Sequence, residues 1–221
     1  MFGSKKYTVA PAEYREGLLV HFSQPVEITK KTKITVPANY KAIAFIDSEP
    51  QFRINPCKDK KFVKTYKKDY LGKSLSIAYI SSCSFSLAPW GFGNIQINNK
   101  EQNETYRVGT NGEFSIEVSD YSALVTAFPG AKEITTDMIR EKCLSTIKMV
   151  GAPVISSCFE GAEVSVFSLD KLIAPFKERF ISSLKEERIF SKLGVKITNL
   201  TVNGFYINPE DLEEIKKQKN I

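Results

Sequence analysis

The chain has 221 residues, a formal net charge of +6 and 42% hydrophobic side chains. This composition excludes a wholly disordered chain, because it supplies enough apolar surface for a packed core. The longest apolar runs, such as residues 75–80, are far shorter than the roughly 20 residues of a membrane-spanning helix. Residues 1–20 lack the features of a signal peptide, so we expect an intracellular, cytoplasmic protein. The mild positive charge suits ordinary solubility and also an anionic partner.

Metal and cofactor chemistry have little support in the sequence. The four cysteines, Cys57, Cys83, Cys143 and Cys158, are widely spaced, and His21 is the only histidine. This spacing fits no zinc site. We therefore expect no metal, no cofactor and free, buried thiols.

The N-terminal half contains short β-rich runs about ten residues apart, a spacing typical of an antiparallel sheet or partial barrel. The runs are residues 18–22, 34–36, 42–46, 52–54, 62–66, 75–80, 83–87 and 95–97. Residues 37–39, Pro-Ala-Asn, predict a hairpin turn between the second and third runs. Residues 104–118 alternate like one long strand, but Gly109 and Gly112 interrupt them. The glycines indicate a bulge or bend, or else Asn111-Gly112 forms a tight hairpin turn.

Helical spacing dominates the second half. Asp120 predicts the start of a short helix, and Thr135 or Thr136 that of a longer one ending at Gly151 and Pro153. A third helical pattern covers 168–184 and contains Pro175, so the helix begins near that proline or kinks there. Residues 195–207 return to strand. Residues 208–211, Asn-Pro-Glu-Asp, predict the start of a last helix.

The fold class that follows is α+β. We expect an antiparallel sheet or partial barrel in the N-terminal half, helices packed on it in the C-terminal half, and a final strand followed by a helix. We divide the chain into an N-terminal strand extension (1–30), a main domain (31–208) and the start of a C-terminal helix (209–221).

Four stretches carry a resemblance to a known family. They are ITVPANYKAIAFIDSEP, PWGFGNIQINN, VGTNGEFSIEVSDYSALVTAF and ERIFSKLGVKITNLTVNGFYINPEDLEEI. Their order and spacing resemble the SPFH or Band 7 superfamily of stomatins, prohibitins and flotillins, and most closely its bacterial virion-core-protein-like branch. The opening turn differs, because the family has Pro-Gly or Glu-Gly where this chain has residues 37–39. The zinc ribbon often appended in this branch is absent, and only the beginning of the family's C-terminal coiled coil is present.

The resemblance implies a non-catalytic scaffold that self-associates, usually at membranes, and recruits protein partners. It implies a homo-oligomer whose last helix contributes Leu212 and Ile215 to the contact. It also implies a location at the inner membrane face, without a transmembrane segment.

Catalytic groups are sparse, and we expect no enzyme activity. A nucleophilic serine or cysteine needs a base within hydrogen-bond reach. His21 lies inside a predicted strand, which favours a structural role. Cys158 follows two serines but has no nearby base in the sequence. Trp90 is expected to pack on the sheet.

The lysine-rich segment, residues 57–73, is the strongest candidate for binding. Its lysines predicted to contact an anionic surface are Lys58, Lys60, Lys61, Lys64, Lys67 and Lys68. Phe62, Tyr66 and Tyr70 alternate with them. The segment could dock on anionic lipid, bind nucleic acid with bases stacked on its aromatics, or be a solvated excursion with inward aromatics. We prefer lipid or protein, with a nucleic-acid-binding module as the alternative function.

Overall fold

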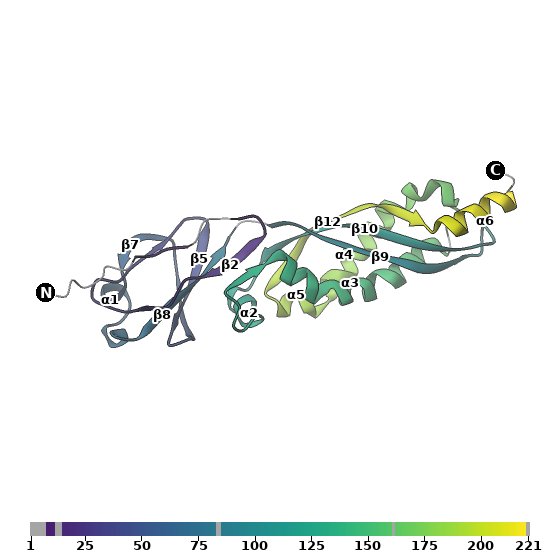
Figure 1. Cartoon of the computed structure of the whole chain (residues 1–221). Coiled ribbons are helices and arrows are strands. Elements are labelled where there is room, and N and C mark those ends of the chain that lie inside the picture. Colours follow the sequence, from purple (N-terminus) through teal and green to yellow (C-terminus); the bar gives the residue numbers. More distant parts are fainter. Residues whose placement is uncertain (1–7, 12–14, 83–84, 161, 220–221) are drawn as a thin grey trace. The chain divides into compact units, whose positions relative to one another are not determined.

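The computed structural model of the protein describes residues 8–11, 15–82, 85–160 and 162–219. The chain divides into two compact units (Figure 1). Unit 1 comprises Met1–Phe85 and Glu117–Thr136, and unit 2 comprises Ser86–Ile116 and Asp137–Ile221. Strands and helices together build the molecule, so the α+β class is confirmed. The division at residues 30 and 208 stays a prediction.

Unit 1 consists mainly of short strands in two sheets. The strands are β1 (Thr8–Val9), β2 (Leu18–Phe22), β3 (Val26–Glu27), β4 (Lys33–Val36), β5 (Tyr40–Ile46), β6 (Glu49–Ile54), β7 (Cys57–Lys61), β8 (Ser74–Ser81) and β11 (Glu133–Thr135). One sheet has the order β1-β4-β7, and the larger one has the order β11-β2-β8-β5-β6 with β3 beside β8. The pairs are antiparallel except β1 with β4, which is parallel.

The predicted hairpin around residues 37–39 is wrong, although its turn exists. Tyr40 N donates to Pro37 O at 3.0 Å, but β4 pairs with β1 and β7 while β5 pairs with β6 and β8. The chain passes from one sheet to the other at this turn. Alternate residues of both strands, such as Ile34 on β4 and Ala44 on β5, enter the same apolar core. Burial on two facing sheets therefore replaces the expected pairing.

The predicted strand at 62–66 is also wrong. The structure has a short helix, α1 (Phe62–Thr65), followed by a 3₁₀ helix, η1 (Lys68–Tyr70). Phe62 is fully buried, and Phe62 N donates to Thr32 O at 3.0 Å. This anchoring turns the chain into a helix where alternation had indicated a strand. The run at 83–87 starts outside the described residues, and strand β9 begins at Phe85.

The last parts of unit 1 are α2 (Tyr121–Thr126) and β11. Asp120 caps α2 as predicted, because its carboxylate accepts from Ser122 N at 2.9 Å and Ala123 N at 3.1 Å. Leu124 and Val125 are buried, and they fix α2 in the unit.

Unit 2 is a three-stranded sheet with helices packed on it (Figure 1). Its strands, in the order β12-β10-β9, are β9 (Phe85–Asn99), β10 (Glu104–Val118) and β12 (Val195–Ile207), and its helices are α3 (Thr136–Phe159), η2 (Val166–Leu172), α4 (Ile173–Glu186), α5 (Arg188–Lys192) and α6 (Pro209–Lys219). Phe180 of α4 packs on Trp90 of β9, with ring centroids 5.1 Å apart. Phe190 of α5 packs on Phe114 of β10 at 6.4 Å. The helices thus cover this sheet of unit 2.

The structure shows what the two glycines of β10 do. Every second residue from Glu104 to Val118 is buried, without interruption, so no hairpin turn exists and β10 itself is not bulged. A Cβ on Gly112 would lie 1.9 Å from Thr201 O and 2.8 Å from Trp90 Cζ2. Gly112 is therefore required by the close approach of β12 and by the indole of Trp90. Trp90 itself is 3% exposed, as expected.

Helix α3 begins at Thr136, as predicted, but continues past Gly151 and Pro153 to Phe159. Gly151 lies against the ring of Phe92, and Ile155 and Phe159 beyond the proline are fully buried. Packing of this last part outweighs the backbone cost of the proline. Pro175 lies in the first turn of α4. Of the two predicted alternatives, the one in which the helix begins near this proline is therefore confirmed.

Candidate anionic-surface contact

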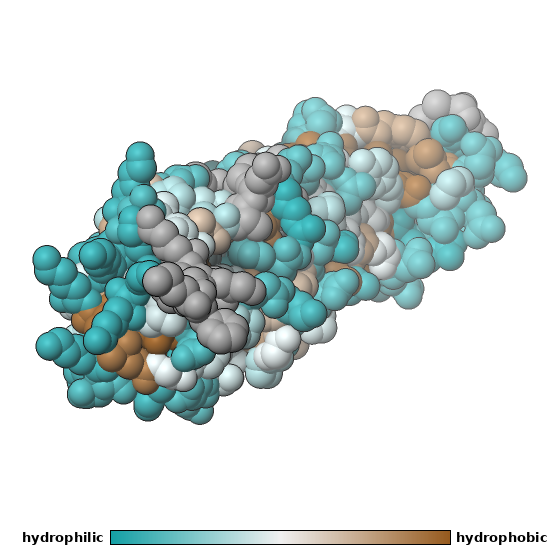
Figure 2. All heavy atoms as spheres, turned by 60° about the vertical axis from the view of Figure 1, so that its left-hand side comes forward, coloured by the Kyte–Doolittle hydropathy of each residue, from teal (hydrophilic) through white to brown (hydrophobic). Residues whose placement is uncertain are grey.

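The lysine-rich segment forms β7, α1 and η1 at one end of unit 1. All six predicted contact lysines have exposed side chains. Within the described residues none of the six forms an ion pair. Figure 2, which brings the α1 end of unit 1 forward, shows hydrophilic side chains around an apolar area. The charges are therefore presented to solvent as a group.

The aromatic side chains of the segment point inward. Tyr66 stacks on Phe52 of β6, with ring centroids 4.5 Å apart and an interplanar angle of 18°. Phe62 and Tyr70 lie 6.0 and 6.2 Å from the same ring. Phe62 is fully buried, and the two tyrosines are half-buried. This cluster gives the lysines a fixed base, and it withdraws the aromatic faces that stacking on nucleic-acid bases would need.

Pairing of β4 with β7 extends the basic surface beyond the predicted segment. Lys33 lies opposite Lys61 in the ladder, and Lys30 and Lys31 are exposed just before it. Sequence reasoning missed these three, although the run Lys-Lys-Thr-Lys at 30–33 was a visible signal. Asp59 is the nearest compensating acid, 3.9 Å from Lys33 Nζ.

Lysines on β7 also have a structural use. Strand β7 is at the edge of its sheet, and charged side chains on an edge strand hinder pairing with a foreign strand. Lys60 and Lys61 serve this purpose whatever else they bind. The charges on α1 and η1, Lys64 and Lys68, lie outside that strand and are not explained by it.

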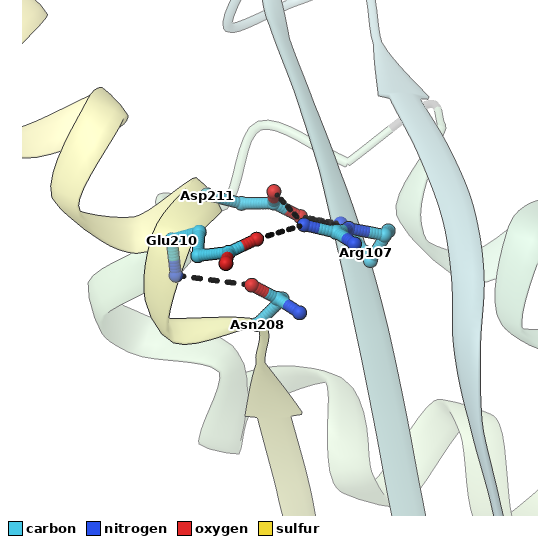
Figure 3. Close-up of polar contacts among 4 residues, drawn as sticks. All are labelled: Arg107, Asn208, Glu210 and Asp211. Atoms are coloured by element: carbon cyan, nitrogen blue, oxygen red, sulfur yellow. Dashed lines mark hydrogen bonds and ion pairs between the residues drawn. The ribbon is translucent and has the colours of Figure 1, made fainter.

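The predicted oligomer contacts lie on α6, which is held against β10. Asp211 accepts from Arg107 N at 2.6 Å, Nε at 3.0 Å and Nη2 at 2.7 Å, and Glu210 accepts from Nη2 at 3.1 Å (Figure 3). Asn208 caps the helix by accepting from Glu210 N at 3.0 Å. Hydrogen bonding by Arg107 lowers the pKa of Asp211 and stabilises the charged form.

A second ion pair fixes the far end of α6. Lys219 pairs with Glu104, whose side chain is buried. Ile215 is 3% exposed, so it packs within its own chain. Leu212 is half-buried, and the prediction of a contact between copies now depends on it.

The residues considered for catalysis each contact a charged side chain of their own unit. His21 Nδ1 lies 3.6 Å from Glu133, which also pairs with Arg15. Burial lowers the pKa of His21, and the Arg15 charge lowers it further. Cys158 is 9% exposed on α3, with Arg179 Nη1 3.7 Å from its sulfur.

Metal and membrane signals are absent from the described part of the chain. No group of three or more His, Cys, Asp or Glu side chains there could hold a metal ion. No helix in that part is long and apolar enough to cross a bilayer. Cys57, Cys143 and Cys158 are free thiols, of which the latter two are buried. Cys83 lies outside the described residues.

Neither the family models nor the curated proteins contain a match to this chain. The SPFH resemblance therefore stays a hypothesis that rests on the four sequence stretches.

Proposed function

We propose that this chain is a non-catalytic scaffold domain that docks on an anionic membrane surface through its lysine-rich segment and gathers copies of itself or protein partners there. The observation that supports this best is the arrangement of the segment. Six exposed lysines lie in one segment of the chain, and the three aromatic residues of that segment pack on Phe52. A fixed base lowers the entropy lost when the lysines meet a surface.

The energetic scale is sufficient for reversible docking. A lysine near an anionic bilayer contributes about 1 kcal/mol. Three further lysines add to the six predicted ones: Lys33 lies on β4 opposite Lys61 of β7, and Lys30 and Lys31 lie in the turn before β4. Because all of these lysines except the half-buried Lys33 are exposed, their attraction should weaken as salt shortens the Debye length, which is about 8 Å at physiological ionic strength.

Vesicle sedimentation tests the docking. We expect the protein to bind vesicles containing anionic phospholipid and to stay in solution with neutral vesicles. Reversing Lys60, Lys61 and Lys64 to Glu should abolish binding. The matched control reverses three exposed lysines of unit 2, Lys148, Lys192 and Lys217, and so changes the net charge equally.

Binding that is equal for the two triple variants would contradict the proposal, because only total charge would then matter. The same two variants should be tested with single-stranded DNA. DNA binding that exceeds vesicle binding and depends on Lys60, Lys61 and Lys64 would favour the nucleic-acid alternative instead.

Self-association is the second part of the proposal. The sequence resemblance supports it, and so does Leu212, an apolar side chain left half-buried on α6. Light scattering at low and high salt should give a mass well above one chain, resistant to salt because apolar contacts persist. A strict monomer at both salt concentrations refutes self-association by this chain.

A further inference from the structure

Unit 1 contains a hollow of about 1150 Å³ that no predicted site explains. Its floor is one face of the larger sheet, where Phe22 and Phe45 meet edge to face at 5.8 Å. Val125 of α2 and the following Phe128 form one wall. Apolar side chains therefore provide most of the interior, as in small-molecule sites.

The hollow also reaches around the edge of the sheet. It is lined by six consecutive residues, Ser48 to Arg53, which include all but the last residue of β6. Successive side chains of a strand point to opposite faces, so contact with all six means that the hollow follows the strand's edge. Strand β6 is an edge strand, but Pro50 lacks an N–H and hinders the addition of a peptide strand there.

Positive charge dominates the rim. Arg53 and Lys132 are exposed lining residues, and neither side chain forms an ion pair or hydrogen bond with the described residues. Glu49 is the one acid in the lining. Lys73 of the lysine-rich segment lies 3.7 Å, through its Nζ, from Asp47, which precedes the lining residue Ser48. Phe52 lines the hollow and also stacks on Tyr66 of the lysine-rich segment. The hollow and the lysine-rich segment thus both contact β6 and the turn before it.

We infer that the hollow takes the acyl chain of an anionic phospholipid, whose head group meets Arg53 and Lys132 at the rim. The inference rests on the proposed docking to an anionic membrane and names the ligand taken from it. An apolar interior with a net positive rim complements an anionic amphiphile. The volume exceeds the roughly 300–1,000 Å³ of a site for a drug-sized molecule, which suits a ligand of this bulk.

Isothermal titration calorimetry with monomeric lysophosphatidylglycerol, below the concentration at which it forms micelles, tests the inference. We expect saturable binding and at least tenfold weaker binding of lysophosphatidylcholine, whose head group is neutral overall. Thr126→Trp places an indole at the wall of the hollow from an exposed position and should weaken binding at least tenfold. Ser182→Trp on the exposed face of α4 is the matched control and should leave affinity unchanged.

A second variant keeps the test independent of Thr126. Arg53→Gln with Lys132→Gln should remove the preference for the anionic lysolipid while leaving lysophosphatidylcholine affinity unchanged. Equal affinities for wild type and Thr126→Trp would overturn the inference. Three other results would also overturn it. Glycerol phosphate alone could displace lysophosphatidylglycerol, palmitate could bind more tightly than lysophosphatidylglycerol, or the protein could form a dimer that Thr126→Trp dissociates. These last three outcomes identify a head-group site, a free fatty-acid site and a contact between copies.

The inference and the proposed function fail separately. Reversal of Lys60, Lys61 and Lys64 should abolish vesicle binding and leave lysolipid affinity within about threefold. Vesicle binding without lysolipid binding would refute the hollow as a lipid site alone. Lysolipid binding without vesicle binding would refute the basic docking surface alone.

Discussion

Gly112 provides the sharpest test of how unit 2 is packed. In Gly112→Ala the new Cβ would lie 1.9 Å from Thr201 O, whereas contacts below 3.0 Å essentially never occur. The carbonyl or the β10 backbone must move by roughly 1 Å, and neither is a flexible side-chain end. The shift would disturb the pairing of Thr201 Oγ1 with Glu113 N, now 3.1 Å, and would displace Trp90. Overpacking against backbone in a filled core should cost about 3 kcal/mol or more.

Trp90 makes the effect measurable, because it is the only tryptophan of the chain and touches Gly112. Its fluorescence should report guanidinium unfolding of unit 2, and the midpoint of Gly112→Ala should fall by about 1 M. The control is Gly93→Ala on β9, where the new Cβ would meet only the Cα of Gly109 on β10, at an ordinary contact distance of 3.9 Å. If the two variants unfold within about 0.5 kcal/mol of each other, the reasoning about Gly112 is wrong.

Three further outcomes are expected. Asp211→Asn should increase hydrogen exchange in α6. Hydrogen bonding lowers the pKa of Asp211, so the stabilisation of α6 by this carboxylate is present above the ordinary aspartate pKa and is lost as pH falls through the lowered value. The variant should therefore show a flatter dependence of α6 exchange on acid pH. Asp120→Ala should destabilise α2 by about 1 kcal/mol, because it removes the cap on Ser122 N and Ala123 N. The control is Ser119→Ala at the exposed neighbouring position, and equal hydrogen exchange of the α2 amides in both variants would contradict the prediction. Burial raises the pKa of the Cys143 thiol to about 12, so at pH 8 iodoacetamide should modify the partly exposed Cys57 first and Cys143 only after unfolding, as peptide mass mapping would show.

The local features of the sequence determined much of the secondary structure. Asp120, Thr136 and the Asn208-Pro209 pair begin helices where capping chemistry predicted, because a cap depends on residues within one turn. Alternation likewise predicted the buried face of β10. In the candidate site, the sequence located the six lysines, and their exposure agrees with the prediction. Their partner Lys33 was missed, since only strand pairing brings it beside Lys61.

Tertiary structure decided the features that join distant segments. Residues 34–36 and 42–46 show the pattern of a hairpin, yet burial against a shared core assigns them to different sheets. Helix α3 continues through Pro153 because residues beyond it are buried. Gly112 is explained only by Thr201 and Trp90. The hollow exists only because α2 and Phe128 lie beside strands that precede them by about 45 residues or more. Local patterns encode the backbone conformation of a segment, whereas the partner that each segment meets depends on packing of the whole unit.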